Sequence, residues 1–327
     1  MMNKEKILSG LVAIFVTAAA TLGICLLSTE VFDAYSYGIF MIMPVVCGAL
    51  SVVVFNRKGK MGFGESIGVS LLSGCVSLLG FLLVGFEGLI CIAMSAPIVL
   101  PLFLIGGLIG LNVSRRVANR VKSDIASLGL VVFAPLFLGF ESAQPFKHTT
   151  RAVETSIVIK GTVQDVWREV IAFSPIPEPQ EFMFRLGIAY PMNAKITGEG
   201  VGAIRYCNFS TGSFVEPITH WEEHKRLAFD VSEQPEPMTE ISPYIGIHPP
   251  HLDWAVRSER GEFLIVQQKD GTVKLLGTTW FHVKMRPECY WGWISDQMIH
   301  MIHTRVLSHI KQSVETDTML SNSAVAK

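Results

Sequence analysis

The first 145 residues are organised as long uncharged stretches separated by short clusters of charged residues. Four of these stretches lie at about residues 7–29, 36–56, 66–86 and 88–112. Each is long enough for a membrane-spanning helix, because a hydrocarbon core of about 30 Å takes about 20 helical residues to cross. A fifth stretch at 125–140 contains Pro135 and reaches only about 24 Å as a helix. The pattern predicts an all-α transmembrane bundle of four or five helices in residues 1–145.

From about residue 150 the pattern changes to short segments with the two-residue period of β-strands. Val153–Lys160 is rich in β-branched residues and predicts a strand. Thr162 follows it with an acidic residue three positions on, which is typical of a helix start. Between Lys195 and Met285 the pattern predicts a run of strands, in which Asp270-Gly271 is the clearest hairpin turn.

The last strand and the last helix of this half are both amphipathic. Alternate positions from Val273 to Met285 are mainly apolar, so one face of this strand is predicted to be buried. The helix predicted from Trp293 to Glu315 carries apolar residues at i, i+4 spacing. That helix must bury its stripe against the sheet, so we expect an α+β domain in which a curved antiparallel sheet grips a long C-terminal helix. A cavity often remains between such layers.

The order of these elements resembles the START/polyketide-cyclase (SRPBCC) helix-grip superfamily. The resemblance is carried by VETSIVIKGTVQDVWREV at the start and EPITHWEEHKRLAFDV in the middle. It covers about residues 152–315, within a soluble domain predicted at 150–316. It implies a ligand cavity but no universal catalytic residue, because such domains serve as lipid carriers, hormone receptors, aromatic cyclases and hydrolase-linked modules. Glu233–Leu252, with five prolines, departs from the pattern as an insertion, and residues 317–327 are predicted to be a flexible tail.

Composition supports the division into two parts. The chain is 50% hydrophobic and 17% charged with a mean hydropathy of +0.41, whereas soluble domains carry about 25% charged residues. Residues 146–327 hold most of the charges and have an ordinary soluble composition. The net charge is −1 with no extended basic block, so nothing indicates a nucleic-acid partner.

The basic residues of the first part predict its orientation. They fall in alternate connections and are absent around Glu30 and Glu87. The positive-inside rule therefore places the N-terminus in the cytoplasm of a multi-pass protein of the plasma or inner membrane. If 125–140 spans, the second domain lies outside the cytoplasm; if it lies in the interface, that domain is cytosolic. Lys147 and Arg151 favour the cytosol, but the four basic residues between 115 and 122 favour the outside, which we expect.

Candidate cavity residues come from the apolar faces of the predicted strands and final helix. They are Tyr206, Phe229, Phe263, Leu275, Phe281, Met298 and Ile302, together with the polar pair Arg205 and Glu216. The pair lies on adjacent predicted strands. It can orient a polar ligand head, although a plain cross-strand ion pair is the favoured interpretation.

Metal, redox and catalytic motifs are sparse. His300 and His303 are spaced i, i+3 and can face one ligand, but no acidic or cysteine partner has matching spacing, so no metal and no cofactor are predicted. A disulfide between Cys207 and Cys289 requires that the domain lie outside the cytoplasm, and even there free thiols are favoured because nothing in the sequence brings the two cysteines close. No nucleophile–base pair, phosphate loop or paired carboxylates stand out.

The leading hypothesis is a membrane-anchored domain, not necessarily an enzyme, that binds a hydrophobic small molecule or lipid beside the bilayer. The first alternative is an enzyme of the cyclase or dehydrase kind that uses polar cavity residues for acid–base chemistry. The second alternative is a signalling or assembly module with a vestigial cavity and an unknown protein partner.

Overall fold

The computed structural model describes residues 4–32, 35–59, 62–116, 120–144 and 149–325 of the chain. The chain divides into two compact units. Unit 1 comprises residues 1–147, 240–249 and 285–287; unit 2 comprises residues 148–239, 250–284 and 288–327. The expected boundary around 145–147 lies outside the described residues. Two short segments from the second half of the sequence thus belong to unit 1.

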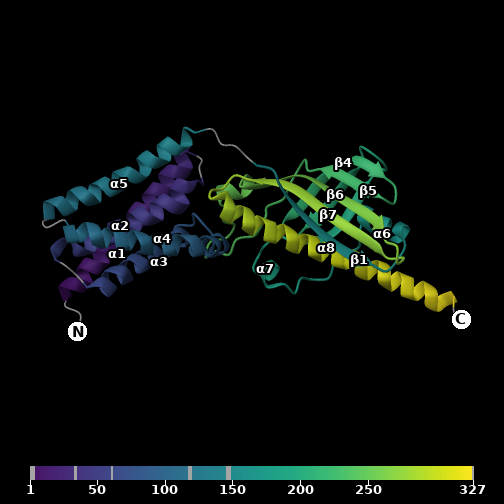
Figure 1. Cartoon of the computed structure of the whole chain (residues 1–327), viewed down its shortest axis with the longest axis horizontal. Coiled ribbons are helices and arrows are strands. Elements are labelled where there is room, and N and C mark those ends of the chain that lie inside the picture. The colour runs from purple at the N-terminus through teal and green to yellow at the C-terminus, as the bar shows by residue number, and fades with distance from the viewer. Residues whose placement is uncertain (1–3, 33–34, 60–61, 117–119, 145–148, 326–327) are drawn as a thin grey trace. The chain divides into compact units, whose positions relative to one another are not determined.

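The described residues of unit 1 form five long helices, coloured purple to teal in Figure 1. They are α1 (Lys4–Phe32), α2 (Met43–Phe55), α3 (Phe63–Leu83), α4 (Leu89–Arg116) and α5 (Arg120–Ser142). A π-helical turn, η1 (Gly38–Ile42), precedes α2 and a 3₁₀ turn, η2 (Asn56–Lys58), follows it. With these turns counted, all five are long and apolar enough to cross a membrane. Helix α5 extends past both ends of the predicted stretch 125–140, and its apolar part, Lys122–Ser142, has 21 residues.

Helices α2 and α4 pack with their backbones in close approach. A β-carbon on Gly106 of α4 would lie 2.1 Å from the Val45 carbonyl oxygen of α2, and one on Gly48 of α2 would lie 2.3 Å from the Phe103 carbonyl oxygen of α4. Neither distance is possible for a side chain, so these positions require glycine. Small residues at the contact are the usual way in which helices pack in lipid.

Ion pairs join the helix ends at one end of unit 1. The Lys6 ammonium lies 3.0 Å from the Glu65 carboxylate, joining the start of α1 to the start of α3. Arg57, just after α2, donates to Asp124 near the start of α5 at 2.8 Å. The N-termini of α1, α3 and α5 therefore share one end of unit 1.

The last turn of α5 lies at the opposite end of unit 1. The Glu141 carboxylate accepts hydrogen bonds from the backbone N–H groups of Tyr37 and Gly38, at 2.9 and 2.8 Å, where the chain enters η1 and α2. Because α2 starts at this end and finishes at the end that carries Arg57, α5 traverses the whole length of unit 1.

The described residues of unit 2 form a seven-stranded sheet and three helices. The strands are β1 (Arg151–Ile159), β2 (Pro191–Thr197), β3 (Ile204–Phe209), β4 (Gly212–Glu222), β5 (Arg226–Asp230), β6 (Val256–Gln267) and β7 (Val273–Val283). They pair in the order β1-β7-β6-β5-β4-β3-β2, with every pair antiparallel. The helices are α6 (Val163–Ile171), the short α7 (Phe182–Arg185) and α8 (Glu288–Val325), and a 3₁₀ turn, η3 (Pro250–Asp253), precedes β6.

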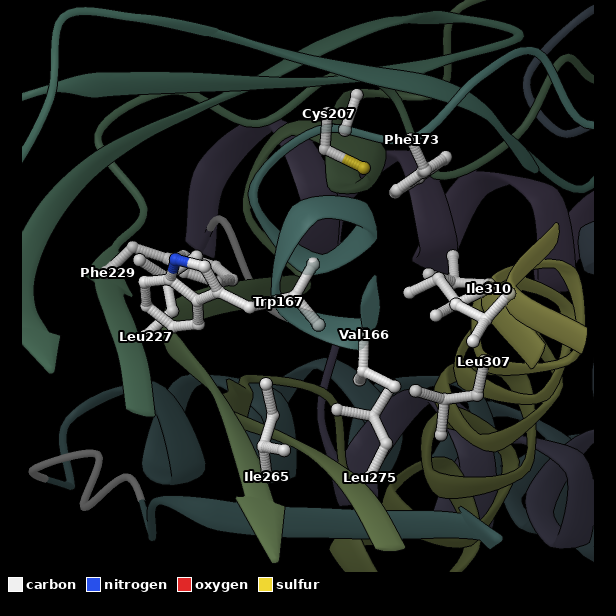
Figure 2. Close-up of a cluster of buried hydrophobic side chains, with 14 of the residues drawn as sticks. Val166, Trp167, Phe173, Cys207, Leu227, Phe229, Ile265, Leu275, Leu307 and Ile310 are labelled. Carbon is white, nitrogen blue, oxygen red and sulfur yellow. The ribbon is translucent and has the colours of Figure 1, made fainter. Parts of the chain in front are cut away.

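Helix α8 runs along the sheet and closes its apolar face (Figure 1). Figure 2 shows Leu307 and Ile310 of α8 facing Val166 of α6 and Leu275 of β7 across the core. All four side chains are buried to 1% exposure or less. The curved antiparallel sheet around a long C-terminal helix is the helix-grip fold that the sequence predicted.

Two local signals in the sequence are confirmed, one at the start of a helix and one at a hairpin turn. The Asp165 N–H donates to the Thr162 hydroxyl at 3.2 Å, which caps α6 as expected. Gly271 takes the left-handed conformation, with φ of 84°, in the hairpin between β6 and β7, and the Asp270 carboxylate accepts from the Thr272 N–H at 3.0 Å. The contacts at Asp270 and Gly271 fix the register of β6 against β7.

The end of the chain differs from the expected flexible tail. Helix α8 continues to Val325, and residues 326–327 lie outside the described part. The segment after Glu315 contains no glycine or proline that would end a helix. The Thr318 hydroxyl also donates to the Val314 carbonyl one turn earlier, at 2.8 Å.

Candidate functional site

Unit 2 holds a cavity of about 100 Å³ between the sheet and α8. Strands β3 to β7 supply one wall, α8 supplies the other, and Phe173 enters from the segment after α6. The polar side chains of most interest around it are Arg205, Cys207, Glu216, Thr279 and His303. None of the residues lining this cavity belongs to the proline-rich insertion Glu233–Leu252, so the insertion does not fill it.

Arg205 and Glu216 form a buried ion pair on the sheet wall. The two residues are directly opposite one another in the β3–β4 register, and their side chains are only 2% and 7% exposed. One guanidinium nitrogen, Nη1, donates to the Glu216 carboxylate, and Nε donates to the Ile171 carbonyl at 3.2 Å. This is the cross-strand pair that the sequence favoured.

The third guanidinium nitrogen of Arg205 has a different environment. Its Nη2 is buried and has no hydrogen-bond partner among the residues that the structure describes. The guanidinium carbon lies 5.5 to 5.7 Å from the ring centres of Phe173, Phe229 and Phe263. Aromatic rings stabilise the charge but accept no conventional hydrogen bond from it. A buried donor without an acceptor costs about 1–3 kcal/mol, so the arrangement favours a ligand that brings an acceptor.

Burial determines the protonation of the two groups next to Arg205. It raises the pKa of the Glu216 carboxyl above its usual value, and the adjacent guanidinium opposes that rise. Burial and the Glu216 charge raise the pKa of Cys207 to about 12. Since the thiolate is the nucleophilic form of cysteine, Cys207 stays a neutral thiol near pH 7 and is not an activated nucleophile.

His303 reaches the cavity from α8 and is held at both ring nitrogens. Its Nε2 lies 2.8 Å from the Thr279 hydroxyl and its Nδ1 lies 3.2 Å from the Thr155 hydroxyl. The Thr155 hydroxyl also lies 2.8 Å from Nδ1 of His300. Burial, reinforced by the neighbouring His300, lowers the pKa of His303 to about 4. The imidazole is therefore neutral near pH 7.

The structure brings five of the nine sequence-derived candidates together around the cavity. They are Arg205, Glu216, Phe229, Phe263 and Ile302. Leu275 and Phe281 are fully buried on the same face of β7 but do not reach the cavity wall. Tyr206 and Met298 are partly exposed and also lie off the wall, Tyr206 because it alternates with Arg205 and Cys207 onto the other face of β3.

Two important lining residues were missed from the sequence. His303 lies four residues after Ile299 and four before Leu307, so its helical spacing placed it on the buried stripe. Phe173 lies in the irregular segment before Pro175, where no periodic signal exists. Only the folded arrangement shows that its ring covers Arg205.

The structure also describes the histidine pair and the cysteine pair that the sequence singled out. Nδ1 of His300 and Nδ1 of His303 both lie within hydrogen-bond distance of the Thr155 hydroxyl. Cys207 is buried on β3 whereas Cys289 is exposed at the start of α8, and the two are not bridged. The structure therefore agrees with the unbridged state that the sequence favoured, because one thiol is buried in unit 2 and the other is exposed.

Comparison with models of protein families and with curated proteins gave no match. Solved structures resemble about half of the chain. A protein from Nitrosospira multiformis is 15% identical, with 52% of this chain and 99% of that chain covered and a TM-score of 0.32. A norcoclaurine synthase point mutant from Thalictrum flavum is 12% identical, with 53% and 99% covered and a TM-score of 0.35. XoxI from Bacillus cereus is 14% identical, with 52% and 96% covered and a TM-score of 0.31.

Proposed function

We propose that this chain is a membrane-anchored binding protein. Its helix-grip unit holds a small, mainly apolar molecule that carries one hydrogen-bond-accepting or anionic group. The observation that carries this proposal is the buried Nη2 of Arg205, which lies on the cavity wall without a partner among the described residues. Glu216 already pairs with the charge of Arg205, so what the site lacks is an acceptor for Nη2, and a carbonyl, hydroxyl or carboxylate oxygen supplies one.

The size of the cavity narrows the ligand class. A dry cavity of about 150 Å³ holds one benzene molecule, and drug-sized ligands occupy about 300–1,000 Å³. At about 100 Å³ the cavity suits a single ring or a short chain. A two-chain lipid needs far more room, so a small aromatic or aliphatic compound is the better candidate.

Benzoate is therefore expected to bind unit 2, and filling the cavity is expected to abolish that binding. Gly277 lines the cavity, and a β-carbon there would meet only ordinary contacts at 3.5 Å from Phe263 and 3.8 Å from Leu307. Gly277→Val should therefore occupy ligand space without disrupting the sheet. The measurement is the urea midpoint of the full-length protein in detergent, which a ligand of the folded state raises.

Leu276→Val on the other face of β7 is the matched control and should leave the benzoate effect unchanged. Toluene, which lacks the acceptor, should raise the midpoint less than benzoate. Native mass spectrometry of the purified protein should also detect a co-purified small molecule. A benzoate effect that survives Gly277→Val, or no effect of any probe and no co-purified molecule, contradicts the proposal.

We also propose that α5 crosses the membrane and that unit 2 lies outside the cytoplasm. The ion pairs of Lys6 and Arg57 group the N-termini of α1, α3 and α5 at the end of unit 1 that carries its basic residues. The contacts of Glu141 place the C-terminal end of α5 at the opposite end. The positive-inside rule assigns the basic end to the cytoplasm, so five crossings deliver unit 2 to the other side.

Alkaline phosphatase fused after residue 327 is expected to be active, and a cytoplasmically active reporter at the same position is expected to be silent. The same pair of reporters fused after Lys58, between α2 and α3, should give the reverse result. A reporter after residue 327 that is active only in the cytoplasm contradicts five crossings and leaves four.

His303 supports a second candidate function, an enzyme that uses acid–base chemistry in the same cavity. A neutral imidazole held by Thr155 and Thr279 is in the protonation state that a general base needs. Arg205, which lines the same cavity, can stabilise a developing oxyanion. The two functions differ in the fate of the bound molecule. A binding protein releases it unchanged, whereas an enzyme converts it, and His303→Gln should abolish that conversion.

A further inference from the structure

Part of the proline-rich insertion belongs to the helical unit rather than to the helix-grip unit. The chain leaves unit 2 after Thr239, contributes residues 240–249 to unit 1, and returns to unit 2 at Pro250. We call Glu240–Pro249 the docked segment. From Ile241 to Leu252 the sequence contains no Asp, Glu, Lys or Arg. Apart from Glu240 at its start, the docked segment is therefore a loop without Asp, Glu, Lys or Arg, and it belongs to the unit that holds five membrane-length helices.

Glu240 fastens one end of the docked segment to the start of α4. Its two carboxylate oxygens accept hydrogen bonds from the backbone N–H groups of Ile90 and Cys91, each at 3.0 Å. The first turn of α4 has no acidic residue of its own, so Glu240 satisfies the free N–H groups from 150 residues away. A β-carbon at Gly88 would lie 2.1 Å from this carboxylate. Glycine at position 88 therefore makes room for it.

Backbone and tyrosine contacts fasten the rest of the segment. The Leu89 N–H donates to the Ile241 carbonyl at 2.8 Å. The Tyr244 hydroxyl donates to the carbonyl of Leu83, the last residue of α3, at 2.5 Å. The docked segment is thus held at the adjoining ends of α3 and α4, where the apolar spans Phe63–Leu83 and Leu89–Arg116 end and begin.

The tip of the docked segment is apolar and exposed. Ile245 is fully exposed, and Tyr244 and Ile241 are 51% and 42% exposed. The adjoining helix ends are also apolar and exposed, with Leu83 at 65% and Val84 at 59%. Side chains of this kind, attached to the ends of membrane-length helices, match the composition of the membrane interface, where tyrosine and apolar residues are favoured.

We infer that the docked segment is a lipid-interface anchor, in which Ile245 and Tyr244 insert among the lipids at the ends of α3 and α4. The inference rests on the proposed membrane insertion of unit 1. Because the segment has no Lys or Arg and is held through the acidic Glu240, insertion depends on apolar contact rather than on attraction to anionic lipids. The docked part of the proline-rich insertion would then lie in the surface of the bilayer.

The test uses the full-length chain in phosphatidylcholine vesicles. The exposed cysteines Cys75 and Cys289 are first replaced by alanine and serine. An environment-sensitive fluorophore is then attached in separate variants at Ile245→Cys, at Leu72→Cys in the middle of α3, and at Val201→Cys in a turn of unit 2. Quenching is measured with lipids that carry a nitroxide at a shallow or a deep position of the acyl chain.

The expected result is quenching of the label at position 245 by the shallow nitroxide, of the label at position 72 by the deep one, and of the label at position 201 by neither. Phosphatidylglycerol should not increase the quenching at 245, and Glu240→Ala should reduce it. Quenching at position 72 without quenching at 245 contradicts the lipid-interface anchor while leaving unit 1 in the membrane. Equal quenching at 245 and 201 also contradicts the anchor, and indicates that the whole domain adsorbs to the vesicle. No quenching at 72 overturns the membrane proposal itself.

Discussion

Arg205→Met is expected to destabilise the helix-grip unit by about 3–5 kcal/mol, the cost of leaving one partner of a buried ion pair alone. Glu216 would remain inside the cavity wall at 7% side-chain exposure without its guanidinium. Burial already raises the pKa of this carboxyl, and removing the guanidinium removes the group that opposes the rise. The loss of stability should therefore be smaller at pH 5, where Glu216 more readily takes up a proton, than at pH 8.

The distribution of tryptophan allows the stability of unit 2 to be measured in the whole protein. All six tryptophans lie in unit 2, at positions 167, 221, 254, 280, 291 and 293. Intrinsic fluorescence during urea unfolding in mild detergent therefore reports on unit 2 without a signal from the helices of unit 1. The slope of the transition shows whether a variant still unfolds in two states.

Two comparisons decide whether the effect comes from a buried charge. The double variant Arg205→Met/Glu216→Leu should recover most of the loss, because an apolar pair of similar volume can replace a buried ion pair. Lys225→Met removes one partner of the exposed pair Lys225–Glu222 and should cost less than about 1 kcal/mol. If Arg205→Met costs no more than Lys225→Met, or if the double variant is as unstable as the single one, the pair does not act as a buried unit.

The architecture of both units follows from signals that are local in the sequence. The apolar stretches of unit 1 and the alternating pattern of β7 each reflect a physical requirement of one segment, namely its length or its buried face. The Asp270-Gly271 turn then fixes how β6 and β7 pair. Even the Arg205–Glu216 pair follows from a short turn between β3 and β4, which sets the two residues opposite one another.

The features that the sequence did not predict depend on contacts between distant segments. The capping of α4 by Glu240 joins residues 150 positions apart, and nothing near Glu240 in the sequence distinguishes it from other surface carboxylates. Phe173 covers Arg205 only because the irregular segment after α6 brings its ring next to the guanidinium of β3. The helical spacing of His303 indicates a buried position on α8. Its two threonine partners could not be predicted, because they come from β1 and β7 and meet His303 only in the folded sheet.

His303 is expected to make unit 2 less stable in acid by about 3 kcal/mol. Its pKa falls from an ordinary 6.5 to about 4 in the folded chain, so between these values the unfolded state binds more protons than the folded state. The stabilising contribution is therefore complete above pH 6.5 and is lost as the pH falls from 6.5 towards 4. The measurement is the free energy of unfolding, from tryptophan fluorescence, at several pH values in this range.

His303→Gln isolates this contribution, because glutamine does not titrate and its amide offers both a donor and an acceptor to the hydroxyls of Thr155 and Thr279. Glu216, whose raised pKa acts in the opposite direction, is present in both proteins, so its effect cancels in the difference between them. The wild type should lose stability relative to His303→Gln steadily from pH 6.5 to pH 4, with little change in that difference above pH 7. An identical pH dependence in the two proteins would mean that the folded chain accommodates the imidazolium. In that case the imidazole is not the neutral, buried base on which the enzymatic alternative depends.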